Sequence, residues 1–285
     1  VMALMNGARL GIAAQSVGVS QAAYDEALKY ARERKQFDTE IVKFPAVYDM
    51  IARIKAKLDA GRSILYQTAR YVDIYKALED IQRERKLTAE ERQELKKYSR
   101  LADAFTPLAK GMNSEYANQN TYDAIQVHGG SGFIMEYKCQ RLYRDARIFS
   151  IYEGTTQLQV VAAIRYISNG TYLGIIKEML EKEVADELKP LKARVVEMVN
   201  LYEQALEYVK EAQDQEMHDF LARRLYNMTC EIIMSLLILE DATRSAELFA
   251  KSANVYVRMA QANVFGEHAY ITNFVKEDLP SFRAE

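Results

Sequence analysis

The sequence is short of the residues that interrupt helices. Its 285 residues include only 4 prolines and 12 glycines. This shortage argues against a β protein with many turns and predicts an all-α fold built from long helices. Tryptophan is absent, and the two cysteines, Cys139 and Cys230, lie far apart and form no C-x-x-C pair. Two reduced thiols are therefore expected, as in a cytoplasmic protein.

The sequence also lacks an excess of charge and a long apolar run. With 38 basic and 40 acidic residues, the net charge of −2 gives no electrostatic reason to expect a nucleic-acid partner. The longest apolar run, Ile232 to Leu239, is interrupted by Ser235 and is too short to cross a bilayer, so no transmembrane segment is expected. No signal peptide is visible. The chain starts at Val1 inside an apolar helical pattern, which predicts a piece of a longer polypeptide.

Common catalytic and metal-binding patterns are missing as well. The three histidines, His128, His218 and His268, have no ligand spacing, so no metal site is expected. No Gly-x-Ser-x-Gly, Walker loop or Gly-x-Gly-x-x-Gly occurs.

The apolar residues that are present recur at helical spacing. In the first part of the chain they predict four long helices, which are residues 2–33, a segment from Pro45 onward, 88–128 and 156–168. Pro45 suits a first helical turn, and Thr88 and Glu91 match a capping box. Residues 79–97 are dense in charge and are interpreted as an insertion, most simply a solvated helical extension. Pro107 is expected to bend the third of these helices.

Residues 1–168 are predicted to form one domain and residues 169–285 a second, beginning at the helix-stop pair Asn169-Gly170. Helices in the second domain are expected at about 172–184, 188–212, 216–245 and 246–269. Their apolar stripes favour an antiparallel bundle. In the first helix, Gly7, Gly11 and Gly18 would weaken an isolated helix, so close packing or ligand approach is expected there.

One acidic residue is placed for chemistry rather than for solubility. Glu153 has no charged neighbour within four residues on either side and lies between Tyr152 and Gly154. Thr155 or Thr156 is a good N-cap for the helix that follows. The glycine lets the backbone pass close to a ligand, and desolvation by apolar surroundings would make the carboxylate a stronger base for proton abstraction.

Glu153 belongs to the last of five segments that occur in a characteristic order. These segments are Arg9–Gly18 (RLGIAAQSVG), Tyr30–Phe37 (YARERKQF), Gln126–Phe133 (QVHGGSGF), Arg144–Arg147 (RDAR) and Ile151–Gln157 (IYEGTTQ). Together they resemble the C-terminal helical domain of the flavin-dependent acyl-CoA dehydrogenases over about residues 2 to 168. The tail, residues 169–285, resembles the added C-terminal domain of a subgroup of that family. Arg144, Asp145 and Arg147 are expected to form a structural salt-bridge cluster.

The resemblance implies an oxidoreductase of fatty acid metabolism that acts in β-oxidation. Such an enzyme converts an acyl-CoA thioester to a trans-2-enoyl-CoA. Glu153 matches the base that removes the α-proton while the β-hydrogen leaves as hydride to FAD. The backbone N–H of Glu153 and a flavin hydroxyl would polarise the thioester carbonyl. A minority of the family places the base just before an arginine of the first helix, but here Ala8 precedes Arg9 and cannot accept a proton.

The resemblance also implies binding residues. The acyl-CoA substrate would contact Asn6, Arg9 and Gly154. Contacts to FAD would come from Arg34, Gln36, Phe37, Gln126, Gly129, Gly130, Thr155 and Gln157, the first six reaching the cofactor of a neighbouring subunit. Arginine suits this task because its planar fork can donate two hydrogen bonds to a pyrophosphate. The family commonly has glycine after the matching phenylalanine, and this sequence has Asp38.

Further expectations concern partners and alternatives. The resemblance implies a homo-oligomer, dimer or tetramer, that passes electrons to an electron-transfer flavoprotein in the cytoplasm. The isolated chain is expected to bind FAD weakly and to turn over no measurable substrate. One alternative is a helical assembly module whose flavin site has lapsed, supported by Asp38 and the insertion at 79–97. Another is a relative that works as an acyl-CoA oxidase.

Overall fold

The computed structural model describes the backbone of residues 2–284 and the side chains of residues 7–284. The described chain is almost entirely helical, which confirms the predicted all-α class. It divides into two compact units, Val1–Gln159 and Val160–Glu285, and the boundary falls within helix α5 (Thr156–Ser168). No helix in the described part of the chain is long and apolar enough to cross a membrane.

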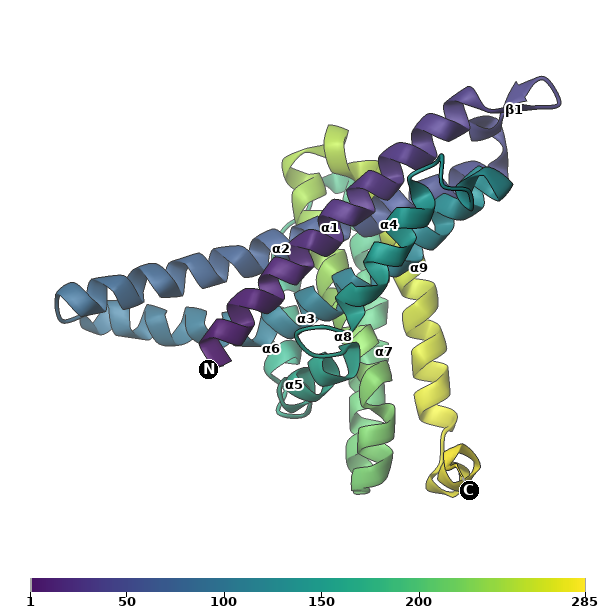
Figure 1. Cartoon of the computed structure of the whole chain (residues 1–285). Helices are drawn as coiled ribbons and strands as arrows, with labels where there is room; N and C mark the ends of the chain where they lie inside the picture. Colours follow the sequence, from purple (N-terminus) through teal and green to yellow (C-terminus); the bar gives the residue numbers. More distant parts are fainter. Residues whose placement is uncertain (1, 285) are drawn as a thin grey trace. The chain divides into compact units, whose positions relative to one another are not determined.

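Three long helices make up most of the first unit (Figure 1). They are α1 (Met2–Glu33), α2 (Pro45–Glu84) and α3 (Ala89–His128). Both α1 and α2 pack along α3. Ala23, Ala27 and Ala31 are buried in this contact, and their spacing of four residues places them on one face of α1. Pro107 lies inside α3, and the helix continues through it.

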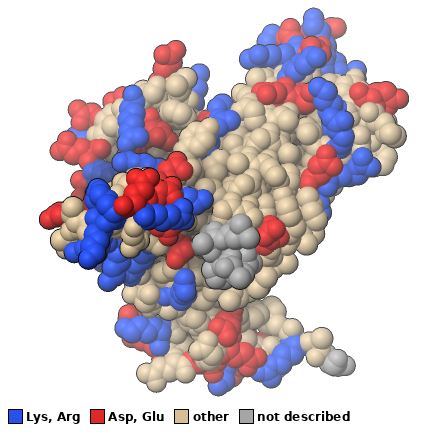
Figure 2. Space-filling model, turned by 60° about the vertical axis from the view of Figure 1, so that its left-hand side comes forward, with Lys and Arg blue, Asp and Glu red and all other residues tan. Residues whose placement is uncertain are grey.

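The charged insertion is the tip of an arm formed by the end of α2 and the start of α3. The predicted capping box is present, because Glu91 N–H donates to Thr88 Oγ1 at 3.2 Å and Thr88 N–H donates to Glu91 Oε2 at 2.8 Å. Arg85 donates to both Glu91 carboxylate oxygens. The hydrogen bonds from Arg85 and then Thr88 lower the pKa of Glu91 to about 2. Charged side chains of both signs are interspersed over the arm (Figure 2).

Short elements between the long helices were not predicted. A hairpin of β1 (Lys35–Gln36) and β2 (Thr39–Glu40) lies in the segment between α1 and α2, with Lys35 opposite Glu40. The other short elements of this unit are η1 (Ile41–Lys43), η2 (Gly129–Gly132), α4 (Cys139–Ala146) and η3 (Arg147–Ser150). Elements of two to eight residues hold too few positions for a period to be recognised.

Glycine packing differs from the prediction. An added Cβ at Gly7, Gly11 or Gly18 would have no atom within 4 Å, so the described residues do not pack closely there, and the other alternative, approach of a ligand, stays a prediction. Tight contacts occur instead at Gly61, where a Cβ would lie 2.1 Å from Asn113 Oδ1, and at Gly132, where it would lie 2.8 Å from the Ile125 carbonyl oxygen. The first-helix glycines therefore leave open space on α1.

The second unit is a helical bundle, as predicted, and it begins within α5. Its other elements are α6 (Thr171–Leu180), η4 (Asp186–Leu188), α7 (Lys189–Glu211), α8 (Gln215–Arg244), α9 (Ala246–Asn273) and η5 (Lys276–Phe282). Helices α7, α8 and α9 pack against one another, and short connections make them antiparallel. Four tyrosines are fully buried, namely Tyr172, Tyr202, Tyr226 and Tyr256. Tyr202 OH accepts a hydrogen bond from Thr229 Oγ1 at 2.8 Å.

Candidate active site

The bend that contains Glu153, Tyr152–Gly154, has an unusual backbone. Glu153 is at φ +55° and Gly154 at φ +95°, a region that glycine adopts readily and other residues rarely. The bend lies between η3 and α5. A glutamate in this conformation is strained by about 1–3 kcal/mol and persists only where its surroundings hold it.

Two buried cations from other helices hold the bend by its carbonyl groups. Nε of Arg9, on α1, donates to the Glu153 carbonyl oxygen at 3.2 Å, and Nζ of Lys110, on α3, donates to the Gly154 carbonyl oxygen at 2.6 Å. Lys110 is fully buried, and only 7% of Arg9 is exposed. Hydrogen bonds from charged donors are among the stronger ones in proteins, so this pair fixes the direction of two successive peptide groups.

Lys110 was missed by the analysis of the sequence. Burial lowers its pKa to about 8, and repulsion from Arg9 acts in the same direction, whereas Glu115 and Glu153 oppose the change. The signal that could have revealed it is a lysine inside the apolar run Leu108–Met112 of a helix. A lysine on a buried face requires a partner elsewhere in the fold.

The Glu153 side chain itself is exposed in this chain. The desolvation that the sequence led us to expect is therefore not supplied by the described residues. The physical reason is that the carbonyl groups of the bend face the buried cations while the carboxylate faces outward. Burial of the carboxylate requires contact with another surface or with a ligand.

Gly154 is required by space as well as by its backbone angle. A Cβ at this position would lie 3.0 Å from Gln159 Nε2 and 3.5 Å from Arg9 Nη2. Gln159 Nε2 donates to the Gly154 carbonyl oxygen at 3.1 Å, so this carbonyl group accepts from both Gln159 and Lys110.

The start of α5 is capped by Thr155, one of the two predicted candidates. Its Oγ1 accepts a hydrogen bond from Leu158 N–H at 3.3 Å. The other candidate, Thr156, donates from Oγ1 to Glu115 Oε1 at 2.6 Å. The beginning of α5 is thereby tied to α3.

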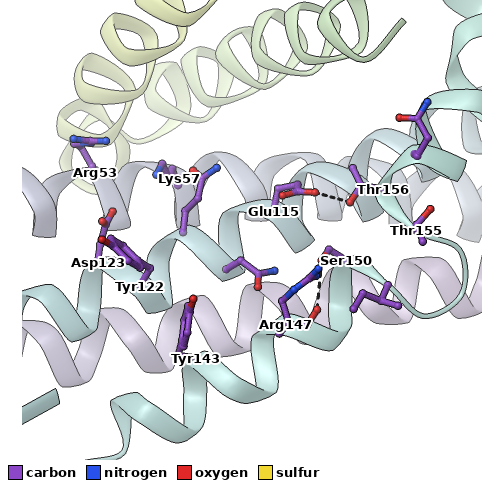
Figure 3. A pocket seen from close by; sticks show the side chains of 14 residues that line it. Arg53, Lys57, Glu115, Tyr122, Asp123, Tyr143, Arg147, Ser150, Thr155 and Thr156 are labelled. Carbon is purple, nitrogen blue, oxygen red and sulfur yellow. Dashed lines mark hydrogen bonds between the residues drawn. The ribbon is translucent and has the colours of Figure 1, made fainter. Parts of the chain in front are cut away.

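An open groove of about 650 Å³ runs beside the start of α5 (Figure 3). Thr155 and Gln157, both expected to contact the cofactor, line it. Its charged lining residues are Arg53, Lys57, Glu115, Asp123 and Arg147. Three of these five are cations, and the N-terminus of a helix also favours negative charge, so the groove suits a ligand that carries anionic groups.

The predicted salt-bridge cluster of Arg144, Asp145 and Arg147 is wrong. All three side chains are exposed, and the ion pairs within the described residues include none of them. Arg147 instead donates to Ser150 Oγ at 2.6 Å at the edge of the groove (Figure 3). Arg144 and Asp145 lie in the last turn of the short helix α4, and Arg147 follows directly after its end.

Arg34, Gln36 and Phe37 lie on the hairpin that follows α1, and all three are exposed. Phe37, at φ +49°, and Asp38, at φ +57°, form its two-residue loop. Positive φ at both positions is typical of a type I′ turn, and aspartate tolerates it, so Asp38 is compatible with a tight turn. The Phe37 side chain is 91% exposed, which is unusual for an aromatic residue without a partner surface.

Gln126, Gly129 and Gly130 lie where α3 passes into η2, and they are exposed. Gly129 has φ +59°. The turn is anchored to α1, because the His128 ring stacks on the Tyr30 ring with centroids 4.3 Å apart. Tyr30 lies one helical turn before Arg34, whose N–H donates to its carbonyl oxygen at 2.8 Å. The hairpin and the glycine turn therefore lie at the same end of the first unit (Figure 1).

The structure thus separates the predicted site residues into two sets. The bend set comprises Arg9, Glu153, Gly154, Thr155 and Gln157. The hairpin set comprises Arg34, Gln36, Phe37, Gln126, Gly129 and Gly130. At the usual rise of an α-helix, Arg9 and Glu33 lie about 36 Å apart along α1. Asn6 lies in α1, but its side chain is outside the described residues.

From the Arg9 region toward the hairpin, α1 presents a face of small, uncharged residues. Its exposed members include Gly7, Ala8, Gly11, Ala14 and Gly18. Figure 2 shows this face as an area without charged side chains that leads up to the charged hairpin end.

Two family models match the sequence. One, described as "Acyl-CoA dehydrogenase, C-terminal domain", matches residues 1–166, and one described as "Acyl-CoA dehydrogenase C terminal" matches residues 168–279. The caffeyl-CoA reductase-Etf complex subunit CarC of Acetobacterium woodii is 40% identical over 158 residues, which are 55% of this chain and 35% of that protein. The 3-(aryl)acrylate reductase of Clostridium sporogenes is 38% identical over 158 residues, with 55% and 36% covered. The chain therefore spans about a third of the length of these curated relatives.

A similar fold occurs in the crystal structure of an acyl-CoA dehydrogenase complexed with FAD from Bacillus anthracis. The TM-score is 0.72 with 22% sequence identity, and the match covers 99% of this chain and 52% of that one. At this identity the likeness shows the fold, including both helical units in one chain.

Proposed function

The chain belongs to the acyl-CoA dehydrogenase family, and we propose that the protein containing it catalyses α,β-dehydrogenation of an acyl-CoA thioester with Glu153 as the base. The clamped bend carries this proposal. An exposed carboxylate stands on a strained backbone whose carbonyl groups are held by two buried cations, Arg9 and Lys110. Strain and perturbed charges that gather around one acid are typical of catalytic sites.

Glu153 would remove the α-proton of the thioester. This proton is a poor acid, so negative charge builds on the thioester carbonyl oxygen and needs a preorganised donor. We assign that role to the backbone N–H of Glu153, which the clamped bend holds in a fixed direction. Arg9 and Gly154 lie beside this point, and we propose that with Asn6 they border the acyl-CoA.

Proton abstraction also requires the carboxylate to lose solvent. Because Glu153 is exposed here and the chain spans about a third of its relatives, we propose that segments outside this chain and the acyl group cover it. The uncharged face of α1 beside the bend suits such a contact. The isolated 285-residue chain is accordingly expected to bind FAD weakly and to be inactive, and a yellow, active preparation of it would contradict this proposal.

The residues of both sets fit a flavin nucleotide. Arg34 can donate a planar fork to a pyrophosphate, and Gly129 and Gly130 let a ligand approach the backbone without a Cβ in the way. Thr155 and Gln157 border a groove with three cations. A bound FAD would supply the acceptor for the hydrogen that leaves the β-carbon. The similar structure from Bacillus anthracis is described as complexed with FAD.

The separation of the two sets supports a homo-oligomer. About 36 Å of α1 lies between Arg9 and the hairpin, which is much more than the width of a flavin ring system. We therefore propose that the hairpin set holds the FAD of a neighbouring subunit, whose own Glu153 serves that cofactor. We propose an electron-transfer flavoprotein as the partner, since the relative from Acetobacterium woodii is named as part of an Etf complex, and a cytoplasmic location.

The names of two relatives favour a second candidate, the reverse reaction. Both the 40% and the 38% identical relatives are named as reductases. In reduction of an enoyl thioester, Glu153 would be the acid that returns a proton to the α-carbon, because the forward and reverse reactions share one transition state. The same residue is required in both directions, and the supply of oxidised or reduced acceptor decides between them.

The test uses the full-length protein that contains this chain, loaded with FAD. Wild type and Glu153→Gln are assayed with a panel of acyl-CoAs and an artificial acceptor, and with enoyl-CoAs and a reduced donor. Loss of both activities by several orders of magnitude in the variant supports the proposal. Equal measurable activities would point to a different base, and a wild type without activity would favour an assembly module with a lapsed flavin site. Turnover with oxygen as sole acceptor would identify an oxidase.

A further inference from the structure

Lys110 makes a contact that its position in a helix core does not explain. It lies in α3 with no exposed surface, inside the run Leu108–Met112. A methionine or leucine would fill this space without the cost of removing an ammonium group from water, which is several kcal/mol for an ion in a protein interior. The lysine crosses to the bend and donates to the Gly154 carbonyl oxygen at 2.6 Å.

A second cation makes the arrangement still less favourable for stability. Arg9 binds the neighbouring carbonyl oxygen, that of Glu153, and the two like charges repel each other. The charged groups that face Lys110 are Arg9 from α1, Glu115 from α3 and Glu153 from the bend. Of these, Glu115 accepts a hydrogen bond from Thr156 Oγ1, and Glu153 is exposed.

We propose that Lys110 is a positioning residue for Glu153: it sets the direction of the catalytic carboxylate through the Gly154 carbonyl group and favours its ionised form through its charge. This inference rests on the proposed function of Glu153. The two carbonyl groups held from the core lie on either side of the Gly154 Cα, so the peptide group that follows the Glu153 Cα is held in place, and this restricts the direction of the Glu153 Cα–Cβ bond. A cation on the inner side of the bend also opposes the loss of charge that desolvation would promote.

The experiment uses the full-length, FAD-loaded protein with Lys110→Met, which keeps the length of the side chain but removes its charge and donor, and Lys110→Arg, which keeps both. The matched control is Lys55→Met. Lys55 donates to both oxygens of the buried Asp59 at 2.6 and 2.7 Å, so the same substitution on α2 removes a cation that pairs with a buried carboxylate. Melting temperature, kcat, KM and the pH dependence of kcat/KM are measured for each protein.

Lys110→Met is expected to lower kcat by at least about tenfold with KM changed by less than about threefold, because orientation and not substrate contact is lost. Its acid limb of kcat/KM should move to higher pH, because a cation that favours the carboxylate is gone. Lys110→Arg should lower kcat, because the guanidinium group is larger than the ammonium group of lysine. The acid limb of its kcat/KM profile should stay where it is in the wild type. Lys55→Met should lower the melting temperature and leave the pH profile in place.

Wild-type kcat and an unmoved acid limb in Lys110→Met would overturn the inference and leave a structural role only. If that variant does not fold, Lys110→Arg decides: a displaced acid limb or an unchanged kcat would contradict it. Failure of the proposed function is recognised separately, since Glu153→Gln would then match wild type in the same assay whatever the Lys110 variants do.

Discussion

Arg9 and Glu153 are 144 residues apart in the sequence, and Nε of Arg9 donates to the Glu153 carbonyl oxygen at 3.2 Å. This bond joins the first helix to the bend that precedes α5. It acts on the backbone of Glu153 and leaves the carboxylate unengaged by Arg9. A base that must take a proton from a ligand benefits from such an arrangement, because the backbone is fixed while the side chain stays available.

Replacing Gly154 by alanine tests how closely the bend is fitted. At φ +95°, with Gln159 Nε2 only 3.0 Å from the new Cβ, Gly154→Ala should destabilise the chain by about 1–3 kcal/mol. This corresponds to a fall in melting temperature of about 3–10 °C. In the full-length protein, kcat should fall by about 10- to 100-fold as the base is displaced.

Gly174→Ala is the matched control for that substitution. Gly174 lies inside α6, and nothing would lie within 4 Å of its Cβ. The change should raise stability by up to about 1 kcal/mol, because alanine is the better helix former. Equal melting temperatures for the two alanine variants would show that the bend has more freedom than its contacts suggest.

The buried Lys110 should make stability depend on pH. Its pKa is lowered from 10.5 to about 8, chiefly by burial. Between these values the unfolded chain binds more protons than the folded one, so the free energy of unfolding should rise with pH, whereas below about pH 8 the cost of the buried charge is fully present. Urea unfolding of the 285-residue chain at several pH values between about 7 and about 10 measures this slope.

Lys110→Met should lack the part of this pH slope that comes from Lys110. The free energy of unfolding of the wild type should therefore increase relative to that of the variant as the pH rises. Lys55→Met retains Lys110 and should follow the wild-type slope. Parallel curves for wild type and Lys110→Met would mean that the lysine is well solvated in the folded chain.

The capping box at the arm tip predicts a pH dependence of the same direction in a lower pH range. The pKa of Glu91 is lowered from 4.5 to about 2, first by Arg85 and then by Thr88. Its contribution is therefore present above about pH 4.5 and lost as the pH falls through about 2. Glu91→Gln should begin to unfold earlier than wild type at pH 6, and the two melting curves should converge near pH 2.

Thr88→Ala removes the other half of the box and should weaken the start of α3 by about 1 kcal/mol. Amide hydrogen exchange at the first turn of α3 should then be about fivefold faster, without a change in the bend. Faster exchange in the bend as well would contradict the view of the arm as a separate extension.

A mixed oligomer tests whether the hairpin serves a neighbouring subunit. Full-length Glu153→Gln and Arg34→Ala are each expected to be impaired alone, the first in proton transfer and the second in retention of FAD. If Arg34 acts across the subunit boundary, a subunit with Arg34→Ala keeps its own Glu153 and receives Arg34 from its Glu153→Gln partner. Mixed dimers should then recover up to about half of the wild-type activity, because one complete site per pair is restored.

If Arg34 served the FAD of its own chain, no mixed dimer would contain a complete site, and mixing would restore nothing. Lys29→Ala, which removes an exposed cation from α1 outside both sets, controls for a general loss of positive charge near the hairpin. It should retain FAD as wild type does.

Much of the fold was readable from the sequence because its signals are local. The periodicity over residues 2–33 and the Thr88–Glu91 box gave α1 and the start of α3 almost to the residue. The hairpin after Arg34 was not predicted, since two residues per strand give no alternation. The tight contact of Gly61 with Asn113, rather than at the glycines of α1, depends on which helices meet.

For the site, the sequence by itself determined which residue is the candidate base, because the isolation of Glu153 and the glycine after it are local facts. Only the tertiary structure decided that Lys110 and Arg9 hold that bend, that the carboxylate is exposed in this chain, and that the hairpin set lies at the far end of α1. The physical reason is that these relationships depend on how α1 and α3 pack, and no local pattern along the chain records which buried cation will reach which carbonyl group.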